Sequence, residues 1–336
     1  MGSIVVKILP ASYGDSFLIE FDNGITILVD GGTRVSMLNN IGIIEQSYSQ
    51  NQENYVMLTH VDNDHIMGII HIFERHNKVY DKIKGVFFNS FSDLKKLTPN
   101  IVDVPPQISI NDSQSSLTGY RQGIAFEEKL LSLGIDTHTN IAAGAKFLLN
   151  EVAINILSPG VESMSRYSTW AEKEEIAYTG RNDCDYAKSL NDLLAAPFIE
   201  DDSITNASSI SVLINYKNKN LLFLGDSIPS DIVHSLEALG YSSENKLQVD
   251  IVKVSHHGSR YNTSPDLLAI IQCDKFIIST DGKLHGHPDK ECLARIIDSQ
   301  ECPELIFNYN IYHAIFLPQE MDCNNFIVCV KKEVTL

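Results

Sequence analysis

The chain is short of basic residues and of long apolar runs. Its 336 residues carry 26 Lys+Arg against 43 Asp+Glu, a formal net charge of −17, so no basic face for duplex nucleic acid is expected. No run approaches the roughly eighteen apolar residues that cross a membrane. The first residues, MGSIVVKILPASYGD, lack the cationic and long apolar parts of a signal peptide. These absences favour small substrates, or single strands steered by local charge, over long phosphate backbones.

Cysteine patterning is equally sparse. No CxxC pair occurs among the six cysteines, which are Cys184, Cys273, Cys292, Cys302, Cys323 and Cys329. Such spacing excludes a compact disulfide framework and predicts reduced, mostly core thiols. Together with the absent signal peptide, it predicts a cytoplasmic protein.

Hydrophobic periodicity predicts alternating strands and helices in both halves of the chain. Strands are predicted at 4–9, 16–21, 25–29, 54–59, 84–88, 146–149, 152–157, 210–216, 220–226, 249–255 and 275–280, with two or three more at the end. Helices are predicted near 35–47, after His65, at 121–133, 230–240, 265–271 and 289–297. In each half of the chain, consecutive strands are followed by strands that alternate with helices. This order predicts an α/β fold in which two mixed sheets pack face to face with helices outside, a four-layer αββα sandwich.

One polar segment breaks this rhythm. Residues 160–205 are rich in Ser, Glu, Asp and Tyr. We interpret them as an insertion into a single domain that spans residues 1–336, with a lid or a protein-partner surface as its role and a disordered excursion as the alternative.

The densest group of reactive side chains is LTHVDNDHIMG, residues 58–68. It places His60, Asp62, Asp64 and His65 within six positions, directly after an apolar strand. Such a group would repel itself and resist burial unless a cation neutralised it. A solvated loop with chance acids and histidines is the alternative, and two further histidine clusters downstream disfavour it.

Three later segments repeat one arrangement, in which polar side chains come directly after a predicted strand. The chain has Asp226 after LLFLG, the group His256, His257 and Ser259 after IVKVS, and the pair His285 and His287 after KFIIST. Loops at strand ends carry chemistry on rigid supports in α/β proteins. Each segment is weak evidence alone, but their order and spacing together indicate a site.

These segments resemble the metallo-β-lactamase fold superfamily. The resembling stretches are GDSFLIEFDNGITILVDGG (14–32), THVDNDHIMG (59–68), NASSISVLINYKNKNLLFLGD (206–226), KVSHHGS (253–259) and GHP (286–288). Their form is closest to the hydrolase domain of competence-type DNA-uptake channel proteins and related phosphodiesterases. The resemblance implies a metallo-β-lactamase-like fold and a two-metal hydrolase.

The resemblance also implies a ligand set. His60 and Asp62 would bind one metal ion, Asp64 and His65 would bind the other, and Asp226 would bridge them. His257 would complete the first site and His287 the second, although His256 could replace His257 and His285 could replace His287.

The same resemblance implies further roles. Asp30 would orient the ligand loop from beneath, and the catalytic group would include Asp64, His256 and Asp30. His256 and Ser259 would face substrate. A turn cap at Asp30 and a helix cap at Ser259 are the structural alternatives.

Two departures from the commoner superfamily pattern bear on the metal. Asp62 stands where many members have a second histidine, and no histidine occurs between 140 and 225 for the usual mid-chain ligand. The carboxylate makes the first site more anionic, so we expect two divalent cations, zinc first, with Mn²⁺ or Fe²⁺ as alternatives.

The favoured reaction is hydrolysis of phosphodiester bonds in a small phosphoester or a single-stranded nucleic acid. Two cations can share and activate a water molecule, and the same chemistry serves esters, thioesters and lactones. A partner-gated effector subunit, working through residues 160–205, is the alternative of a different class. A basic cluster could guide a strand if it flanked the site; it comprises Arg75, Lys78, Lys82, Lys84 and Lys95-Lys96.

Overall fold

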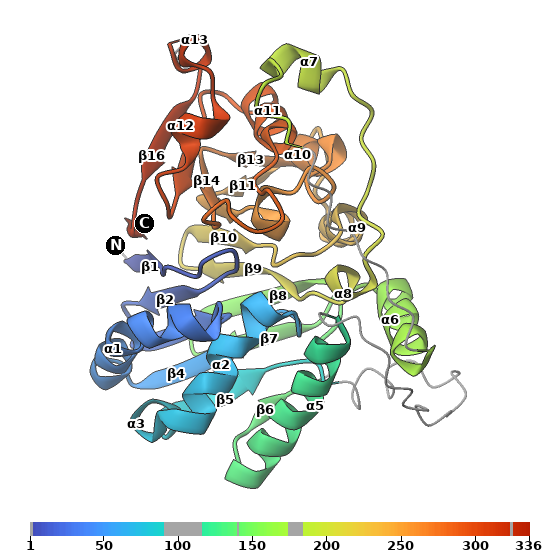
Figure 1. Cartoon of the computed structure of the whole chain (residues 1–336). Helices are drawn as coiled ribbons and strands as arrows, with labels where there is room; N and C mark the ends of the chain where they lie inside the picture. Colours follow the sequence, from blue (N-terminus) through green and yellow to red (C-terminus); the bar gives the residue numbers. More distant parts are fainter. Residues whose placement is uncertain (1–2, 91–115, 140, 174–183, 323–324) are drawn as a thin grey trace.

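Two mixed sheets lie face to face, with helices on both outer sides (Figure 1). The computed structural model describes residues 3–90, 116–139, 141–173, 184–322 and 325–336. The predicted αββα sandwich is confirmed. Within the described residues, no helix is both long enough and apolar enough to cross a membrane.

The first sheet has the strand order β17-β1-β2-β3-β4-β5-β6. Its strands are β1 (Ile4–Ile8), β2 (Phe17–Phe21), β3 (Ile25–Val29), β4 (Glu53–Met57), β5 (Ile83–Phe87), β6 (Thr137–His138) and β17 (Glu333–Thr335). The segment from β17 to β3 is antiparallel, and β3 to β6 run parallel. Helices α1 (Arg34–Gln50), α2 (Asn63–Arg75), α3 (Asn77–Tyr80) and α5 (Ser116–Leu133) belong to this half of the chain.

The second sheet has the order β16-β15-β14-β12-β10-β9-β8-β7. Its strands are β7 (Lys146–Leu149), β8 (Val152–Ser158), β9 (Ser211–Tyr216), β10 (Lys219–Phe223), β12 (Ile251–Lys253), β14 (Lys275–Ile278), β15 (Glu304–Phe307) and β16 (Ile327–Val330). Its helices are α9 (Pro229–Ala238), α10 (Pro265–Ile270), α11 (Lys290–Ser299), α12 (Tyr312–Ile315) and α13 (Pro318–Met321). The run from β10 to β16 is parallel.

Alternating side chains build three apolar layers. Inward residues of both sheets meet in the middle, where Phe17 and Phe223 pack edge to face with ring centroids 5.4 Å apart. The outward residues of the first sheet, such as Leu28, pack with Ile69 of α2. The outward residues of the second sheet pack under α9 to α11. The period of two in the strands therefore places one face of each sheet inside the sandwich and the other beneath helices.

One predicted strand proves to be two. The stretch 249–255 is divided between β11 (Leu247–Val249), which pairs with β13 (Ile271–Cys273) in a separate small sheet, and β12 of the main sheet. The division falls at Asp250, whose carboxylate accepts hydrogen bonds from Asn220 N (2.9 Å) and Lys219 Nζ (2.7 Å). An apolar run does not show which sheet its residues join, and the prediction of one continuous strand was therefore wrong.

The carboxyl ends of the parallel strands define where the site lies. Loops carrying the predicted ligands leave β4 at 58–62, β10 at 224–226, β12 at 254–259 and β14 at 279–288. Parallel neighbours β3 and β4, and β10, β12 and β14, end at the same edge of their sheets. The fold thus gathers segments far apart in the sequence.

The basic cluster lies elsewhere. Lys82 and Lys84 stand at the start of β5, which is parallel to β4, so they lie at the sheet edge opposite the end of β4. Arg75 and Lys78 are at the far end of α2 and in α3, and Lys95-Lys96 falls outside the described residues. These four described residues therefore do not flank the predicted site.

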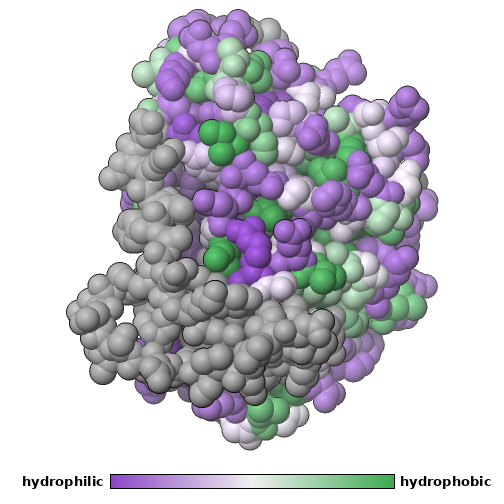
Figure 2. Space-filling view, turned by 90° about the vertical axis from the view of Figure 1, so that its right-hand side faces the viewer, coloured by the Kyte–Doolittle hydropathy of each residue, from purple (hydrophilic) through white to green (hydrophobic). Residues whose placement is uncertain are grey.

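The polar segment 160–205 connects β8 to β9, which are antiparallel neighbours. Its described parts contain α6 (Val161–Lys173), α7 (Leu190–Leu194) and α8 (Ile204–Ala207), while residues 174–183 lie outside the described chain. Figure 1 shows α6 and α8 on the same side of the molecule, and hydrophilic residues gather near the centre of the face seen from that side (Figure 2). A single domain with a partner-binding insertion stays a prediction.

Glycines let the end of β3 approach helix α2 very closely. A Cβ atom on Gly68 would lie 1.9 Å from the carbonyl oxygen of Gly31, and one on Gly31 would lie 2.4 Å from Ile69 N. The same approach allows Gly31 N to donate to His65 O at 2.9 Å. The two glycines therefore set the depth at which the first turns of α2 sit on the sheet.

Substituting Gly68 with alanine should therefore destabilise the fold. We expect a loss of about 3 kcal/mol or more, because the clash is with backbone and not with a flexible side chain. The control is Gly42→Ala at an exposed position of α1, where a Cβ meets nothing within 4 Å. That change should raise the free energy of unfolding by about 0.5–1 kcal/mol. Urea unfolding measures both, and equal midpoints for the two variants would contradict the packing argument.

Candidate metal centre

The ligand loop joins β4 to α2. His60 is buried, Asp62 is the N-cap residue of α2, and Asp64 and His65 lie in its first turn. The helix begins three residues earlier than predicted. Its positive N-terminal pole favours carboxylates at this position. The helix start therefore points two acids and a histidine toward the strand ends.

Asp30 contacts this loop from beneath. Its Oδ1 accepts from Thr59 N at 2.8 Å, and its Oδ2 accepts from Thr59 Oγ1 at 2.7 Å. The same Oδ2 lies 2.7 Å from Nδ1 of His65. Asp30 is fully buried and has a positive φ of 56°, a conformation that non-glycine residues rarely adopt. The carboxylate thus fixes both ends of the loop.

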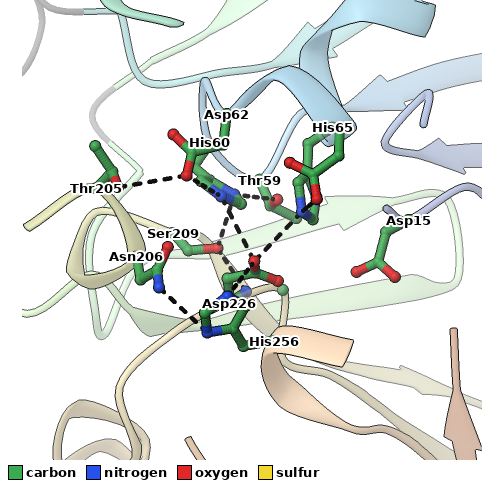
Figure 3. A network of polar contacts seen from close by, with 12 residues as sticks. Asp15, Thr59, His60, Asp62, His65, Thr205, Asn206, Ser209, Asp226 and His256 are labelled. Carbon is green, nitrogen blue, oxygen red and sulfur yellow. Dashed lines mark hydrogen bonds and ion pairs between the residues drawn. The ribbon is translucent and has the colours of Figure 1, made fainter. Parts of the chain in front are cut away.

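Four imidazoles converge on one oxygen of Asp226, and Figure 3 shows three of them, those of His60, His65 and His256. Its Oδ2 lies 3.4 Å from Nε2 of His65, 3.6 Å from Nε2 of His257, and 3.8 Å from Nε2 of both His60 and His256. Ligand atoms about 2.0–2.1 Å from a tetrahedral zinc lie about 3.4 Å from one another. The spacing therefore suits cations between the carboxylate and the rings.

The other ring nitrogen of each imidazole is already engaged. The Nδ1 atoms and their partners are His60 with Thr59 Oγ1 (3.0 Å), His65 with Asp30 Oδ2 (2.7 Å), His256 with Asn262 Oδ1 (3.0 Å) and His257 with Ser279 O (2.9 Å). Metal-binding histidines are typically oriented by such a contact at the second nitrogen. All four rings are therefore held with Nε2 facing the same space.

Unpaired buried atoms test whether cations fit there. The Nε2 atoms of His60, His65 and His257 are buried without a hydrogen-bond partner, and so is Oδ1 of Asp226. Each such atom costs about 1–3 kcal/mol if nothing compensates it. Imidazole nitrogen and carboxylate oxygen are both good ligands for divalent transition metals. The donor set fits bound divalent cations.

Charge in this cluster supports the same conclusion. Burial alone would raise the pKa of Asp226, but the neighbouring His65 and His257 hold it well below its usual range. Burial alone would lower the pKa of His257, but the carboxylates of Asp226 and Asp15 raise it to about 10. The ionised carboxylates thus require positive charge nearby, which protons on the rings or bound cations can supply.

The two consecutive histidines, His256 and His257, lie on different sides of the Asp226 carboxylate. His257 Nε2 lies 3.4 Å from Asp64 Oδ2, which groups it with the Asp64 and His65 side. On the other side, Thr205 Oγ1 contacts Asp62 Oδ2 at 3.4 Å. The adjacent Asn206 lies 3.2 Å from His256. The predicted pairing of His257 with His60 and Asp62 does not fit these distances.

His287 and His285 lie beside the cluster. The His287 ring is 4.9 Å from the His256 ring and 6.5 Å from the His257 ring, measured between centroids. Its Nδ1 is 3.6 Å from Asp289 Oδ2. Burial lowers the pKa of His287 to about 4, so the ring is neutral. His285 is exposed and packs edge to face with Tyr13 at 6.1 Å. Both histidines therefore border the four-imidazole group.

Ser259 does not face the opening. Its side chain is buried, and its Oγ accepts a hydrogen bond from Tyr261 N at 3.2 Å. A buried hydroxyl engaged with the backbone is not positioned to contact substrate. Ser259 does not cap the next helix either, because the N-cap of α10 is Ser264.

The sequence interpretation missed two buried charges. Asp15 contacts His257 Nδ1 through Oδ1 at 3.3 Å and belongs to a group of four ligand-competent residues with His65, Asp226 and His257. Lys253 forms a buried ion pair with Asp15 and donates to Gly225 O at 2.9 Å. A lysine within the apolar strand IVKVS was the available signal for this pair.

The chain is an αββα sandwich with a buried group of His and Asp side chains that could hold a metal ion. Residues 9–143 match the family model of the Metallo-beta-lactamase superfamily, and this segment contains the ligand loop from His60 to His65. The predicted resemblance to that superfamily is thereby confirmed for this segment, which is less than half of the chain. No curated protein matches the sequence.

Solved structures with a similar overall shape have low sequence identity to this chain. Zn(2+)-bound PqqB from Methylobacterium extorquens is 11% identical with a TM-score of 0.46, and the match covers 100% of this chain and 99% of that one. A diphosphatase from the PhnP family is 9% identical with a TM-score of 0.44, covering 100% and 98%. A long form RNase Z from yeast is 12% identical with a TM-score of 0.41, covering 96% and 43%.

Proposed function

We propose that this protein is a hydrolase with two divalent cations. The observation that carries the proposal is the convergence of four imidazole Nε2 atoms on Oδ2 of Asp226, at 3.4–3.8 Å. Asp226 would hold both cations. His60, Asp62 and His256 would complete the first site, and Asp64, His65 and His257 would complete the second. This division rests on the contacts of His256 and His257.

The bound cations would supply an activated water and stabilise negative charge on the attacked group. The protein's own residues orient this chemistry. Asp30 fixes His65 and the loop that carries His60, and Thr59 fixes the ring of His60. His256 is the most open of the four rings, with 24% of its side chain exposed. Substrate therefore reaches the first site from this side.

The proposed substrate class is a phosphodiester, either a small phosphoester or a single-stranded nucleic acid. The combined HxDxDH, HHGS and GHP motifs support it through their resemblance to the hydrolase domain of DNA-uptake channel proteins and related phosphodiesterases. His287 and His285 border the site and can contact phosphate oxygens. Their place beside the ligands supports a substrate-binding role for His287 in preference to a metal-binding one.

Metal counting tests the ligand assignment. Purified protein loaded with Zn²⁺ should bind two ions per chain by elemental analysis. His60→Ala and His257→Ala should each lose one ion, because each removes one ligand of a different site. His287→Ala should retain both ions and lose activity. Loss of an ion from His287→Ala, together with two ions in His257→Ala, would overturn the assignment and restore His287 as a ligand.

Turnover tests the reaction class. The zinc and manganese forms should hydrolyse bis(p-nitrophenyl) phosphate or single-stranded DNA faster than a thioester of matched leaving group. Faster thioester cleavage would move the assignment to esters, thioesters or lactones, which the same centre can serve. No turnover of any of these substrates with either metal would contradict the proposed function.

A further inference from the structure

The two halves of the metal centre rest on different parts of the fold. The second half is supported from sheet ends, since Nδ1 of His65 contacts Asp30 after β3 and Nδ1 of His257 contacts Ser279 O after β14. The first half is supported from the end of the connection between β8 and β9. There Thr205 contacts Asp62, and Asn206 contacts His256 (Figure 3).

Asp201 holds the residues by which the β8–β9 connection supports the first half of the metal centre. Its Oδ2 accepts from Asn206 Nδ2 at 2.7 Å and from Asn262 Nδ2 at 2.9 Å. Its Oδ1 accepts from Ser203 N at 2.9 Å, and its backbone nitrogen donates to Tyr261 O at 3.0 Å. One carboxylate therefore ties α8 to the loop after the histidine pair.

These bonds determine how Asn262 faces His256. The amide nitrogen of Asn262 donates both to Asp201 and to Asp226 O, the latter at 3.2 Å. The amide oxygen is thereby turned toward Nδ1 of His256, at 3.0 Å. An oxygen accepts, so Nδ1 carries the hydrogen. The lone pair of His256 then resides on Nε2, which faces Asp226.

The Asn206 amide nitrogen would favour a lone pair on Nδ1, but it is already engaged with Asp201. Asn206 Nδ2 lies 3.2 Å from Nδ1 of His256, a longer separation than the 2.7 Å hydrogen bond that it donates to Asp201. The Asp201 carboxylate itself lies 3.6 Å from Nδ1, and its negative charge favours a hydrogen at that nitrogen. The Asn262 oxygen and the Asp201 carboxylate therefore place the hydrogen on Nδ1 and leave Nε2 as the ligand atom.

We propose that Asp201 is a positioning residue that fixes the orientation and tautomer of His256, and that metal occupancy of the first site therefore depends on the end of the segment 160–205. The inference rests on the proposed two-metal centre. It adds that the first site depends on the β8–β9 connection through His256, although Thr59 and Asp30 also hold His60, whereas both histidines of the second site are held from the sheet ends.

The decisive variant is Asp201→Asn, with Asp202→Asn as its control. Asp202 is exposed and adjacent, so the control makes the same charge change without the three contacts. Asp201→Asn should weaken binding of one of two Zn²⁺ ions by about 10–100-fold, as loss of an orienting partner typically does. Turnover should recover toward that of the parent protein as metal is added in excess, which damage to the fold would not allow. Asp202→Asn should match the parent.

Combined variants identify which site is weakened. Asp201→Asn with His60→Ala should still bind one ion, because both changes affect the first site, whereas Asp201→Asn with His257→Ala should bind none tightly. If Asp201→Asn fails to fold by circular dichroism, Asn262→Ser removes the acceptor for Nδ1 and should give the same selective loss. Two ions bound with unchanged affinity in the folded variant would overturn the inference. A parent protein that binds fewer than two ions would instead contradict the proposed function.

Discussion

Replacing Asp226 with asparagine is expected to reduce hydrolysis by about 10³-fold or more, since several kcal/mol of charge stabilisation from the cations is at stake. The substitution keeps the size of the side chain but removes the negative charge on which all four Nε2 atoms converge. Both sites share this oxygen in the proposed arrangement. The variant should therefore lose metal from both sites, unlike any single histidine variant.

Asp274→Asn is the matched control, because Asp274 is exposed and stands before β14, at the other end of that strand from the site. The measurements are metal content and kcat/KM at saturating Zn²⁺. An Asp226→Asn protein with two bound ions and near-parental turnover would show that the convergence is a structural hydrogen-bond cluster.

Replacing Lys253 with methionine is expected to destabilise the metal-free protein by about 3–5 kcal/mol, the usual cost of breaking a buried ion pair. Lys253 is 1% exposed, pairs with buried Asp15, donates to Gly225 O, and lies 3.8 Å from Oδ1 of Asp226. Methionine fills similar volume but leaves two buried carboxylates without their nearest fixed positive charge. Urea unfolding after metal removal measures the loss.

Lys219→Met provides the comparison, because the Lys219–Asp250 pair is partly exposed and should contribute about 1 kcal/mol or less. Adding Asp15→Asn to Lys253→Met should recover part of the stability by removing one of the stranded charges. If the losses of stability in Lys253→Met and Asp15→Asn simply added in the double variant, the argument that Lys253 compensates the charge of Asp15 would be contradicted.

The site could be located from the sequence because strand ends and ligand-rich loops are local features. The apolar run before His60 and the glycine before Asp226 placed both residues at strand ends, and parallel packing then brought them together. The divided strand at Asp250 escaped prediction because its two parts join different sheets. That choice depends on partners such as β13, far along the chain.

The roles of the consecutive histidines could not be predicted from their order. In a regular strand, neighbours point to opposite faces. Here His256 and His257 both have positive φ, at 46° and 54°, and both rings face Asp226. Left-handed backbone costs about 1–2 kcal/mol per residue, so the surrounding structure must impose it. Asp201 was missed for a related reason, since its contacts to Asn206 and Asn262 depend on folding.

The site lies at the seam between the two sheets. His60, Asp64 and His65 come from the first half of the chain, whereas Asp226 and His257 come from the second. Cations bound here would link the two halves and stabilise their packing, in addition to any chemical role. Residues 9–143 hold only four of the proposed ligands, so neither half could assemble the centre alone. Hydrolytic activity would then require the two sheets to be packed against each other. Any event that separated the sheets would abolish the activity without changing a ligand residue.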